Sequence, residues 1–199
     1  MGGRWLVFGL GNPGTHYARH RHNVGAMVVA ELARRGGGTW KSRHLIKADL
    51  AEIRIGASGA GAVGADLAQV DLVRSRMYMN QSGLPANSLL KSLKIDPAHL
   101  VVVHDELDLD FGRMRAKFGG GDNGHNGLKS IRDRLGGDYY RLRVGIGRPS
   151  GSTDVYRWVL SDFTSVEVRD LGAILAKAAD AVETLVWAGL EAAQQRFNS

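Results

Sequence analysis

Four short polar segments stand out in the chain, because each one follows an apolar run that is typical of a strand. They centre on Asn12, Asn80, Asp105 and Asn126, and they contain side chains suited to acid–base chemistry or to binding a polar substrate. The carboxyl ends of parallel strands meet at one edge of a sheet, where α/β proteins commonly bind their ligands. We therefore expect the four segments to converge on one polar site.

A histidine and an aspartate in two of these segments indicate general-base chemistry. His22 follows the first apolar run, and Asp105 lies in the segment His-Asp-Glu-Leu-Asp directly after Val101–Val103. An ionised aspartate orients an imidazole and stabilises its protonated form. The chain contains no cysteine and no G-x-S-x-G motif, so a water activated by His22 is the expected nucleophile. A single histidine is more often an ordinary surface or core residue, and only the convergence of the segments favours catalysis.

Three asparagines add neutral hydrogen-bonding groups to the expected site. Asn12, Asn80 and Asn126 offer both donors and acceptors, which suit a peptide backbone and a developing oxyanion. Each segment also has a simpler interpretation. Asn80 is a good N-cap for a helix, Asp105 is a good turn residue, and the glycines before Asn126 are compatible with a flexible loop.

The first loop contains a pattern that is also found in dinucleotide-binding proteins. Gly9–Gly14 reads G-x-G-x-x-G after a strand, which is the basis of an alternative prediction, a nucleotide-dependent oxidoreductase. Three features argue against it: Pro13 removes a backbone N–H, the next helix begins only near Val24, and no acidic residue follows a second strand at the required distance. His20 and His22 lack a third ligand with metal-site spacing, so we expect neither a cofactor nor a metal.

Composition indicates a single cytoplasmic domain that spans residues 1–199. The chain has 199 residues, of which 44% are hydrophobic, and this is enough to bury a core. We see no export signal and no apolar run long enough to cross a membrane. The formal net charge of +6 is compatible with a polyanionic partner such as nucleic acid, and equally with an ordinary basic enzyme.

Strand patterns alternate with helix patterns along the chain, which predicts an α/β fold. We expect a mixed, mostly parallel twisted sheet flanked by helices, with a C-terminal helix that begins at the capping box Thr164-x-x-Glu167. The glycine- and alanine-rich segment 56–65 is expected to form a loose hairpin. The expected strands are 5–10, 51–55, 70–73, 100–103, 113–117 and 141–147, and the other expected helices cover about 24–35, 88–95 and 128–135.

Six motifs, taken in order, resemble those of bacterial-type peptidyl-tRNA hydrolases. Each motif alone is modest, but the six together are highly specific, and the resemblance runs from Trp5 to about Pro149. In this chain they read Gly-Leu-Gly-Asn-Pro-Gly, Tyr-x-x-x-x-His-Asn-x-Gly, Met-Asn-x-Ser-Gly, His-Asp-Glu-Leu-Asp, Gly-His-Asn-Gly-Leu-Lys and Arg-Leu-Arg-Val-Gly-Ile-Gly.

The resemblance implies a monomeric, metal-free esterase that acts on peptidyl-tRNA. It implies that His22 is the general base and that Asp105 orients it. The remaining roles implied by the family are positioning of peptide, water and ester by Asn12, Asn80 and Asn126, lining of the substrate groove by Tyr17, Met79 and His125, and binding of tRNA phosphate by Lys117 and Arg143.

The chain also departs from the family pattern in the glycine-rich loop. Asp122-Asn123 replaces the small residues that are usual there, and an acidic group at this place is expected to repel RNA slightly. The alternative to hydrolysis is an RNA-binding module on the same fold, since relatives of this family assist intron splicing in plant organelles. A peptide-release assay separates the two functions.

Overall fold

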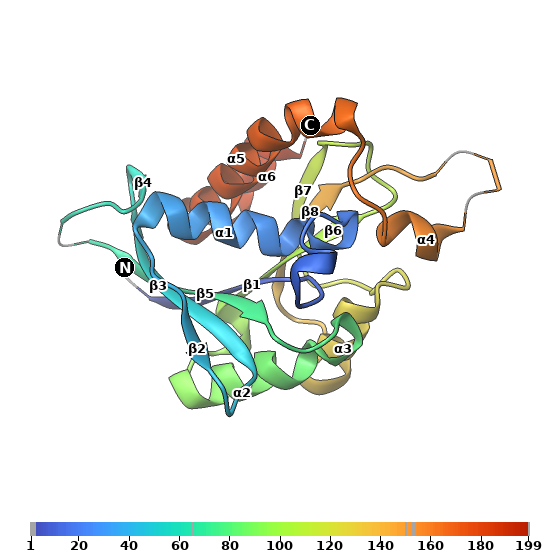
Figure 1. The fold of residues 1–199 in the computed structure, drawn as a ribbon. Coiled ribbons are helices and arrows are strands. Elements are labelled where there is room, and N and C mark those ends of the chain that lie inside the picture. The colour runs from blue at the N-terminus through green and yellow to red at the C-terminus, as the bar shows by residue number, and fades with distance from the viewer. Residues whose placement is uncertain (1–2, 65, 150, 153, 199) are drawn as a thin grey trace.

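The structure is a computed structural model that describes residues 3–64, 66–149, 151–152 and 154–198. One mixed sheet lies between two layers of helices (Figure 1). Its strands are β1 (Arg4–Gly9), β2 (Lys41–Arg43), β3 (Ala48–Gly56), β4 (Gly59–Ala60), β5 (Ala68–Ser75), β6 (Leu100–Glu106), β7 (Met114–Phe118) and β8 (Tyr140–Gly145). The helices are α1 (Val24–Gly36), α2 (Gly83–Leu93), α3 (Asn126–Leu135), α4 (Val155–Val159), α5 (Ser165–Ala188) and α6 (Leu190–Phe197), with short 3-10 turns η1 (Thr15–Tyr17), η2 (Arg21–Asn23), η3 (Met79–Gln81) and η4 (Pro97–His99).

The centre of the sheet is parallel and its two sides are antiparallel. The strand order is β2-β3-β5-β1-β6-β8-β7, and β4 pairs with β3. Strands β5, β1, β6 and β8 run in the same direction, whereas β3 is antiparallel to β5 and β7 is antiparallel to β8. The mixed, mostly parallel sheet predicted from the sequence is confirmed.

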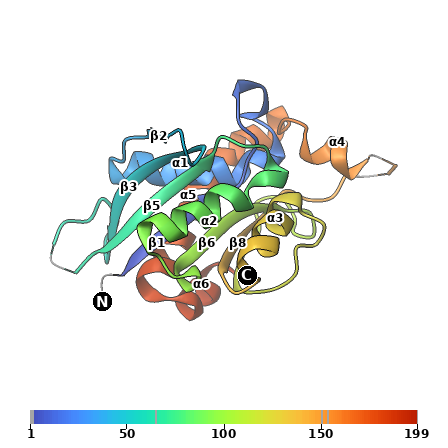
Figure 2. The ribbon, with the colours of Figure 1, turned by 90° about the horizontal axis from the view of Figure 1, so that it is seen from below.

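Both faces of the sheet are covered, which explains why its central strands are apolar on both sides. Every residue of β6 is buried. Val101 and Val103 face α1, α5 and α6, whereas Leu100 and Val102 face α2 and α3, so the two layers of core alternate along the strand. Figure 2 shows α2 and α3 together on the second face.

The glycines of the first loop act in packing. Gly9 lies against the backbone of Gly25 in α1, and a Cβ atom on Gly25 would collide with the carbonyl oxygen of Val103. These contacts let the start of α1 lie directly on strands β1 and β6. The turn η2, which carries His22, is thereby held at the carboxyl edge of the sheet.

Several boundaries differ from the sequence-based predictions. Strand β6 continues to Glu106 because residues 104–106 pair with 143–145 of β8, so Asp105 lies within the strand and the alternative interpretation of it as a turn residue is wrong. Helix α2 begins five residues earlier than expected, at Gly83, with Pro85 tolerated in its first turn. The C-terminal helix begins with the predicted capping box but ends at Ala188, where Gly189 (φ 89°) separates it from α6.

The expectation that all four polar segments follow strand ends at the same edge is wrong for the glycine-rich loop. Strand β7 is antiparallel to β8, and Phe118 at its end pairs with Tyr140 at the start of β8. The loop therefore starts at the opposite edge and reaches the carboxyl edge over residues 122–126. In the described part of the chain, no helix is both long and apolar enough to span a membrane.

Candidate active site

A cavity of about 860 Å³ opens at the carboxyl edge of the parallel strands. Eight of the ten predicted site residues line it, and they come from the loop after β1, from η1, η2 and η3, from the end of β6 and from the start of α3. They are Asn12, Tyr17, His22, Met79, Asn80, Asp105, His125 and Asn126. The convergence expected from the sequence is therefore present in the fold.

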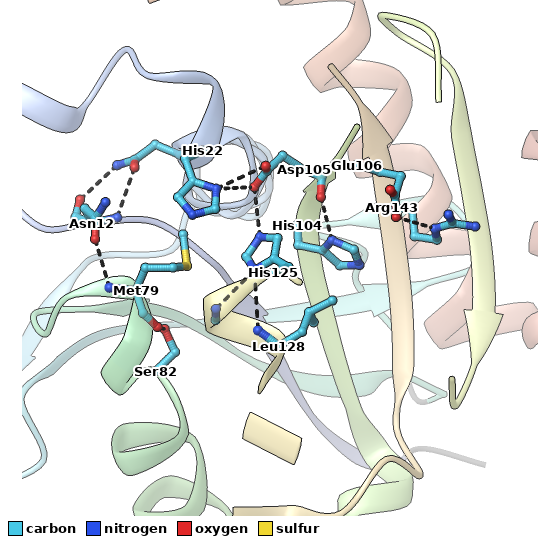
Figure 3. A network of polar contacts seen from close by, with 12 residues as sticks. Asn12, His22, Met79, Ser82, His104, Asp105, Glu106, His125, Leu128 and Arg143 are labelled. Carbon is cyan, nitrogen blue, oxygen red and sulfur yellow. Dashed lines mark hydrogen bonds and ion pairs between the residues drawn. The ribbon is translucent and has the colours of Figure 1, made fainter. Parts of the chain in front are cut away.

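His22 and Asp105 both line the cavity and form a buried pair, which is drawn in Figure 3. The Nδ1 atom of His22 lies 2.9 Å from Oδ1 and 3.0 Å from Oδ2 of Asp105. Only 11% of the His22 side chain and 3% of the Asp105 side chain are exposed. A carboxylate accepts the Nδ1 proton, so the Nε2 atom of neutral His22 keeps its lone pair and can accept a proton.

The electrostatics of the pair favour an ionised Asp105 and a more basic His22. Burial disfavours the charged form of both groups, but each group gains more from its charged partner than it loses by burial. For His22, burial lowers the pKa, and the charge and hydrogen bond of Asp105 raise it by more. Conversely, the nearby imidazoles of His22 and His125 hold the pKa of Asp105 well below its ordinary value. Asp105 is therefore ionised at neutral pH and available to stabilise the His22 imidazolium.

A second imidazole contacts the same carboxylate. The Nε2 atom of His125 lies 3.0 Å from Oδ1 of Asp105, and its side chain is 8% exposed. His22, Asp105 and His125 are thus grouped closely enough to suggest ligands of a metal ion, a cluster that sequence spacing did not reveal. The observed contacts are hydrogen bonds from the ring nitrogens to the carboxylate, and a nitrogen that donates a proton has no lone pair for a metal.

Asn12 is held rigidly by its neighbours. Its backbone N–H donates to Oδ1 of Asn23 (3.0 Å), and its carbonyl oxygen accepts from Nδ2 of the same side chain (2.9 Å). The side-chain Oδ1 of Asn12 accepts from the backbone N–H of Met79 (2.8 Å), so the amide orientation is fixed and its NH₂ group is left as a donor. The sequence indicated Asn12, but it gave no role to Asn23, which positions it.

The other predicted substrate-binding residues differ in exposure. Asn80 and Asn126 line the cavity and are exposed, whereas Met79 is 4% exposed and packs beneath it. Tyr17 is half-buried and makes an edge contact with Tyr78, with 6.2 Å between ring centroids. The exposed asparagine side chains are free to change their hydrogen bonds when a substrate enters.

Lys117 and Arg143 lie outside the cavity, on the face of the sheet that α3 covers in part. In the antiparallel pairing Lys117 is opposite Arg141, two residues before Arg143, so Lys117 lies toward the amino edge of the parallel strands and away from the loops that line the cavity. The two cations still share one face, where burial and the charges of Arg141 and Arg143 lower the pKa of Lys117. The Nε of Arg143 donates to Glu106 (2.9 Å), which lines the cavity.

The departure at Asp122 has a structural explanation. Its carboxylate pairs with Arg132 (2.6 Å) and accepts the backbone N–H of Gly124 (3.0 Å). The buried guanidinium of Arg141 donates to the carbonyl oxygens of Gly120 and Gly121. The glycine-rich loop is therefore anchored at both ends, and the charge of Asp122 is offset by Arg132, so the expected repulsion of RNA is reduced.

Several residues that line the cavity were not singled out from the sequence. Tyr78 and Tyr156 expose aromatic rings at its mouth, and His104 and Glu106 form part of its wall beside Asp105. Tyr78 lies between Met77 and Met79 in a segment that the sequence motifs include, and an aromatic residue next to Met79 was the available signal. Tyr156 belongs to α4, a five-residue helix whose segment carries no motif.

The fold and the polar cavity at the carboxyl edge of its sheet define an α/β protein with the layout of a hydrolase. The sequence profile described as "Peptidyl-tRNA hydrolase" matches residues 6–199. The chain belongs to the peptidyl-tRNA hydrolase family.

Similar proteins extend over the whole chain. The chain is 50% identical to a peptidyl-tRNA hydrolase of Cutibacterium acnes, with all of both sequences covered, and 52% identical to one of Kineococcus radiotolerans, covering 100% of this chain and 99% of the relative. The crystal structure of peptidyl-tRNA hydrolase from Acinetobacter baumannii superposes with a TM-score of 0.84 at 33% identity, covering 98% of this chain and 94% of that one. The resemblance read from six motifs is confirmed.

Proposed function

We propose that this protein hydrolyses the ester bond between peptide and tRNA in peptidyl-tRNA, with His22 as the general base. The observation that carries the proposal is the buried His22–Asp105 pair in a cavity that Asn12, Asn80 and Asn126 also line. Membership of the peptidyl-tRNA hydrolase family supports the choice of substrate. Release of tRNA from stalled or aborted translation would be the consequence in the cell.

The proposed reaction uses water as the nucleophile. Nε2 of His22 takes a proton from water while the water oxygen bonds to the ester carbonyl carbon, and the carbonyl electrons move to its oxygen. Asp105 stabilises the imidazolium that forms. When the tetrahedral intermediate collapses, the bond between carbon and the ribose oxygen breaks. His22 returns its proton to that oxygen, which leaves a peptide carboxylic acid and the free tRNA hydroxyl.

The asparagines have distinct proposed tasks. The fixed NH₂ group of Asn12 donates to the substrate, because its Oδ1 is already used by Met79. Asn80 and Asn126, exposed on either side of the cavity, bind the peptide and the ester carbonyl, where donors stabilise negative charge on oxygen. Tyr17, Met79 and the wall formed by His125 shape the groove.

The tRNA body is proposed to contact the face that carries Lys117 and Arg143. A basic chain gains affinity for RNA by contacting phosphates and releasing counterions. The N–H groups of Gly127 and Leu128 in the first turn of α3 donate to His125, so they are not available to a phosphate. We propose that the protein acts as a monomer in the cytoplasm.

The test is a peptide-release assay on peptidyl-tRNA with the parent protein and His22→Ala. We expect the parent to release peptide and the variant to lose about 10²–10⁴-fold in rate, with tRNA binding largely retained. Binding of tRNA without release by the parent would indicate an RNA-binding module. Near-normal turnover by His22→Ala would exclude His22 as the base.

A further inference from the structure

Both ring nitrogens of His125 are engaged inside the protein. Its Nδ1 lies 3.1 Å from the backbone nitrogen of Gly127 and 3.4 Å from that of Leu128, at the start of α3. Its Nε2 lies 3.0 Å from Oδ1 of Asp105. His125 is therefore the N-cap of α3 as well as a neighbour of the catalytic pair (Figure 3).

The two contacts determine where the proton of neutral His125 resides. A backbone N–H can only donate, so Nδ1 must offer a lone pair and carries no hydrogen. The single ring proton is then on Nε2, and it points at a carboxylate that accepts it. Protonating Nδ1 would leave the N–H groups of Gly127 and Leu128 facing a donor, which opposes the other tautomer.

Asp105 is consequently held from both layers of the fold. His22 approaches it from the side of α1, and His125 approaches it from the side of α3. The Oδ1 atom is shared, with 2.9 Å to Nδ1 of His22 and 3.0 Å to Nε2 of His125. The carboxylate cannot rotate far without losing one of these bonds, and because it stays ionised it can only accept the proton of His22 Nδ1.

We propose that His125 is a positioning residue whose tautomer, set by the start of α3, locks Asp105 and thereby presents Nε2 of His22 as the base. This role rests on the proposed function of His22. It differs from the groove-lining role that the family resemblance implied, because His125 acts through Asp105 and need not touch substrate. It also links the position of Asn126, the first residue of α3, to the catalytic pair.

The informative variant is His125→Asn. Asparagine is among the most favoured N-cap residues, so α3 keeps its cap, but the shorter side chain does not reach Asp105. We expect kcat for peptidyl-tRNA to fall by about 10–100-fold, the loss that is typical when an outer hydrogen-bond partner of a metal-ligating residue is removed. KM and the melting temperature should change little. The matched control is His44→Asn, an exposed histidine on the β2–β3 turn, which should behave like the parent.

A direct readout is the ¹⁵N NMR spectrum of the imidazoles at pH 8. We expect His125 to be protonated on Nε2 and His22 on Nδ1 in the parent, and His22 to populate both tautomers in His125→Asn. A proton on Nδ1 of His125 in the parent would overturn the proposal. So would a His125→Asn variant with raised KM and unchanged kcat, or a stoichiometric shift of both imidazoles on adding Zn²⁺ at equimolar concentration.

The outcomes separate this inference from the proposed function. If His22→Ala retains turnover, the general-base mechanism fails, whatever tautomer His125 adopts. If His22→Ala is inactive while His125→Asn keeps the parent's kcat, the base is correct and the positioning role is wrong.

Discussion

The Nδ1 atom of His22 lies 2.9 Å from Oδ1 of Asp105, and both side chains are almost fully buried. The two residues are 83 positions apart in sequence and come from a 3-10 turn and a central strand. Their contact depends on the close packing of Gly9 and Gly25, which draws the start of α1 onto the sheet. The geometry of this pair is thus a property of the packed layers and not of one local motif.

We predict that Asp105→Asn lowers the plateau of kcat/KM and moves its acid limb to lower pH. His22 must be neutral to accept a proton, so activity rises with pH through the pKa of His22. In the parent, burial is outweighed by the charge and hydrogen bond of Asp105, which raise that pKa above 6.5. In the variant burial remains and the charge of the carboxylate is removed, so the pKa of His22 falls even though the amide oxygen can still accept a hydrogen bond.

The plateau should fall by about 10²–10⁴-fold, because the amide cannot stabilise the imidazolium by charge. The measurement is peptide release between pH 5 and 9, with circular dichroism to confirm the fold. An unchanged profile with full turnover would mean that Asp105 has only a structural role.

We predict that EDTA leaves peptide release unchanged. His22, Asp105 and His125 lie close enough together to suggest a metal cluster, but their nitrogens donate to the carboxylate. A metal would have to displace the protons that hold this network together. Inactivation by EDTA with recovery on adding a divalent ion would contradict the hydrogen-bonded description of the site.

The sequence predicted those site residues whose positions are set by the ends of parallel strands. Asn12, Asn80 and Asp105 follow or end parallel strands, and apolar runs reveal such strands clearly. Strand direction is not encoded in those runs, so they do not predict that β7 is antiparallel to β8, which places Lys117 toward the amino edge of the parallel strands. The contacts of Asn23 and His125 were also missed, because a side chain's partners depend on packing between elements that no local pattern specifies.

We predict that Glu167→Gln destabilises the protein although it lies outside the cavity. Its Oε2 accepts from Nη2 of Arg21 (2.6 Å), whose side chain is 1% exposed and stacks 3.8 Å from the ring centre of Trp158. Glutamine can still complete the capping box with Thr164, so the change mainly removes the charge that pairs with buried Arg21.

Leaving a buried charge without its partner costs about 3 kcal/mol, which urea unfolding can measure. The matched control is Arg34→Ala, which breaks an exposed pair with Glu31 and should leave the unfolding midpoint unchanged. Equal effects of the two variants would mean that Arg21 is adequately solvated or paired without Glu167.

We predict that Lys117→Ala combined with Arg143→Ala raises KM for peptidyl-tRNA and flattens its salt dependence. Only Nε of Arg143 is hydrogen-bonded to a described residue, Glu106, so its two terminal nitrogens are left for a phosphate. Ion pairs with phosphate position a substrate and act mainly on binding. Removing one such ion pair should reduce the log–log salt slope by about 0.7–0.9.

The control variant is Lys41→Ala with Arg43→Ala, which removes the same charge from β2 at the opposite edge of the sheet. It should leave KM and the salt slope near those of the parent, whereas a general effect of net charge would change both variants alike. A minimal ester substrate without the tRNA body should be cleaved almost equally by all three proteins. If the Lys117/Arg143 variant loses activity on both substrates alike, these cations support Glu106 and the cavity wall, and the phosphate clamp is wrong.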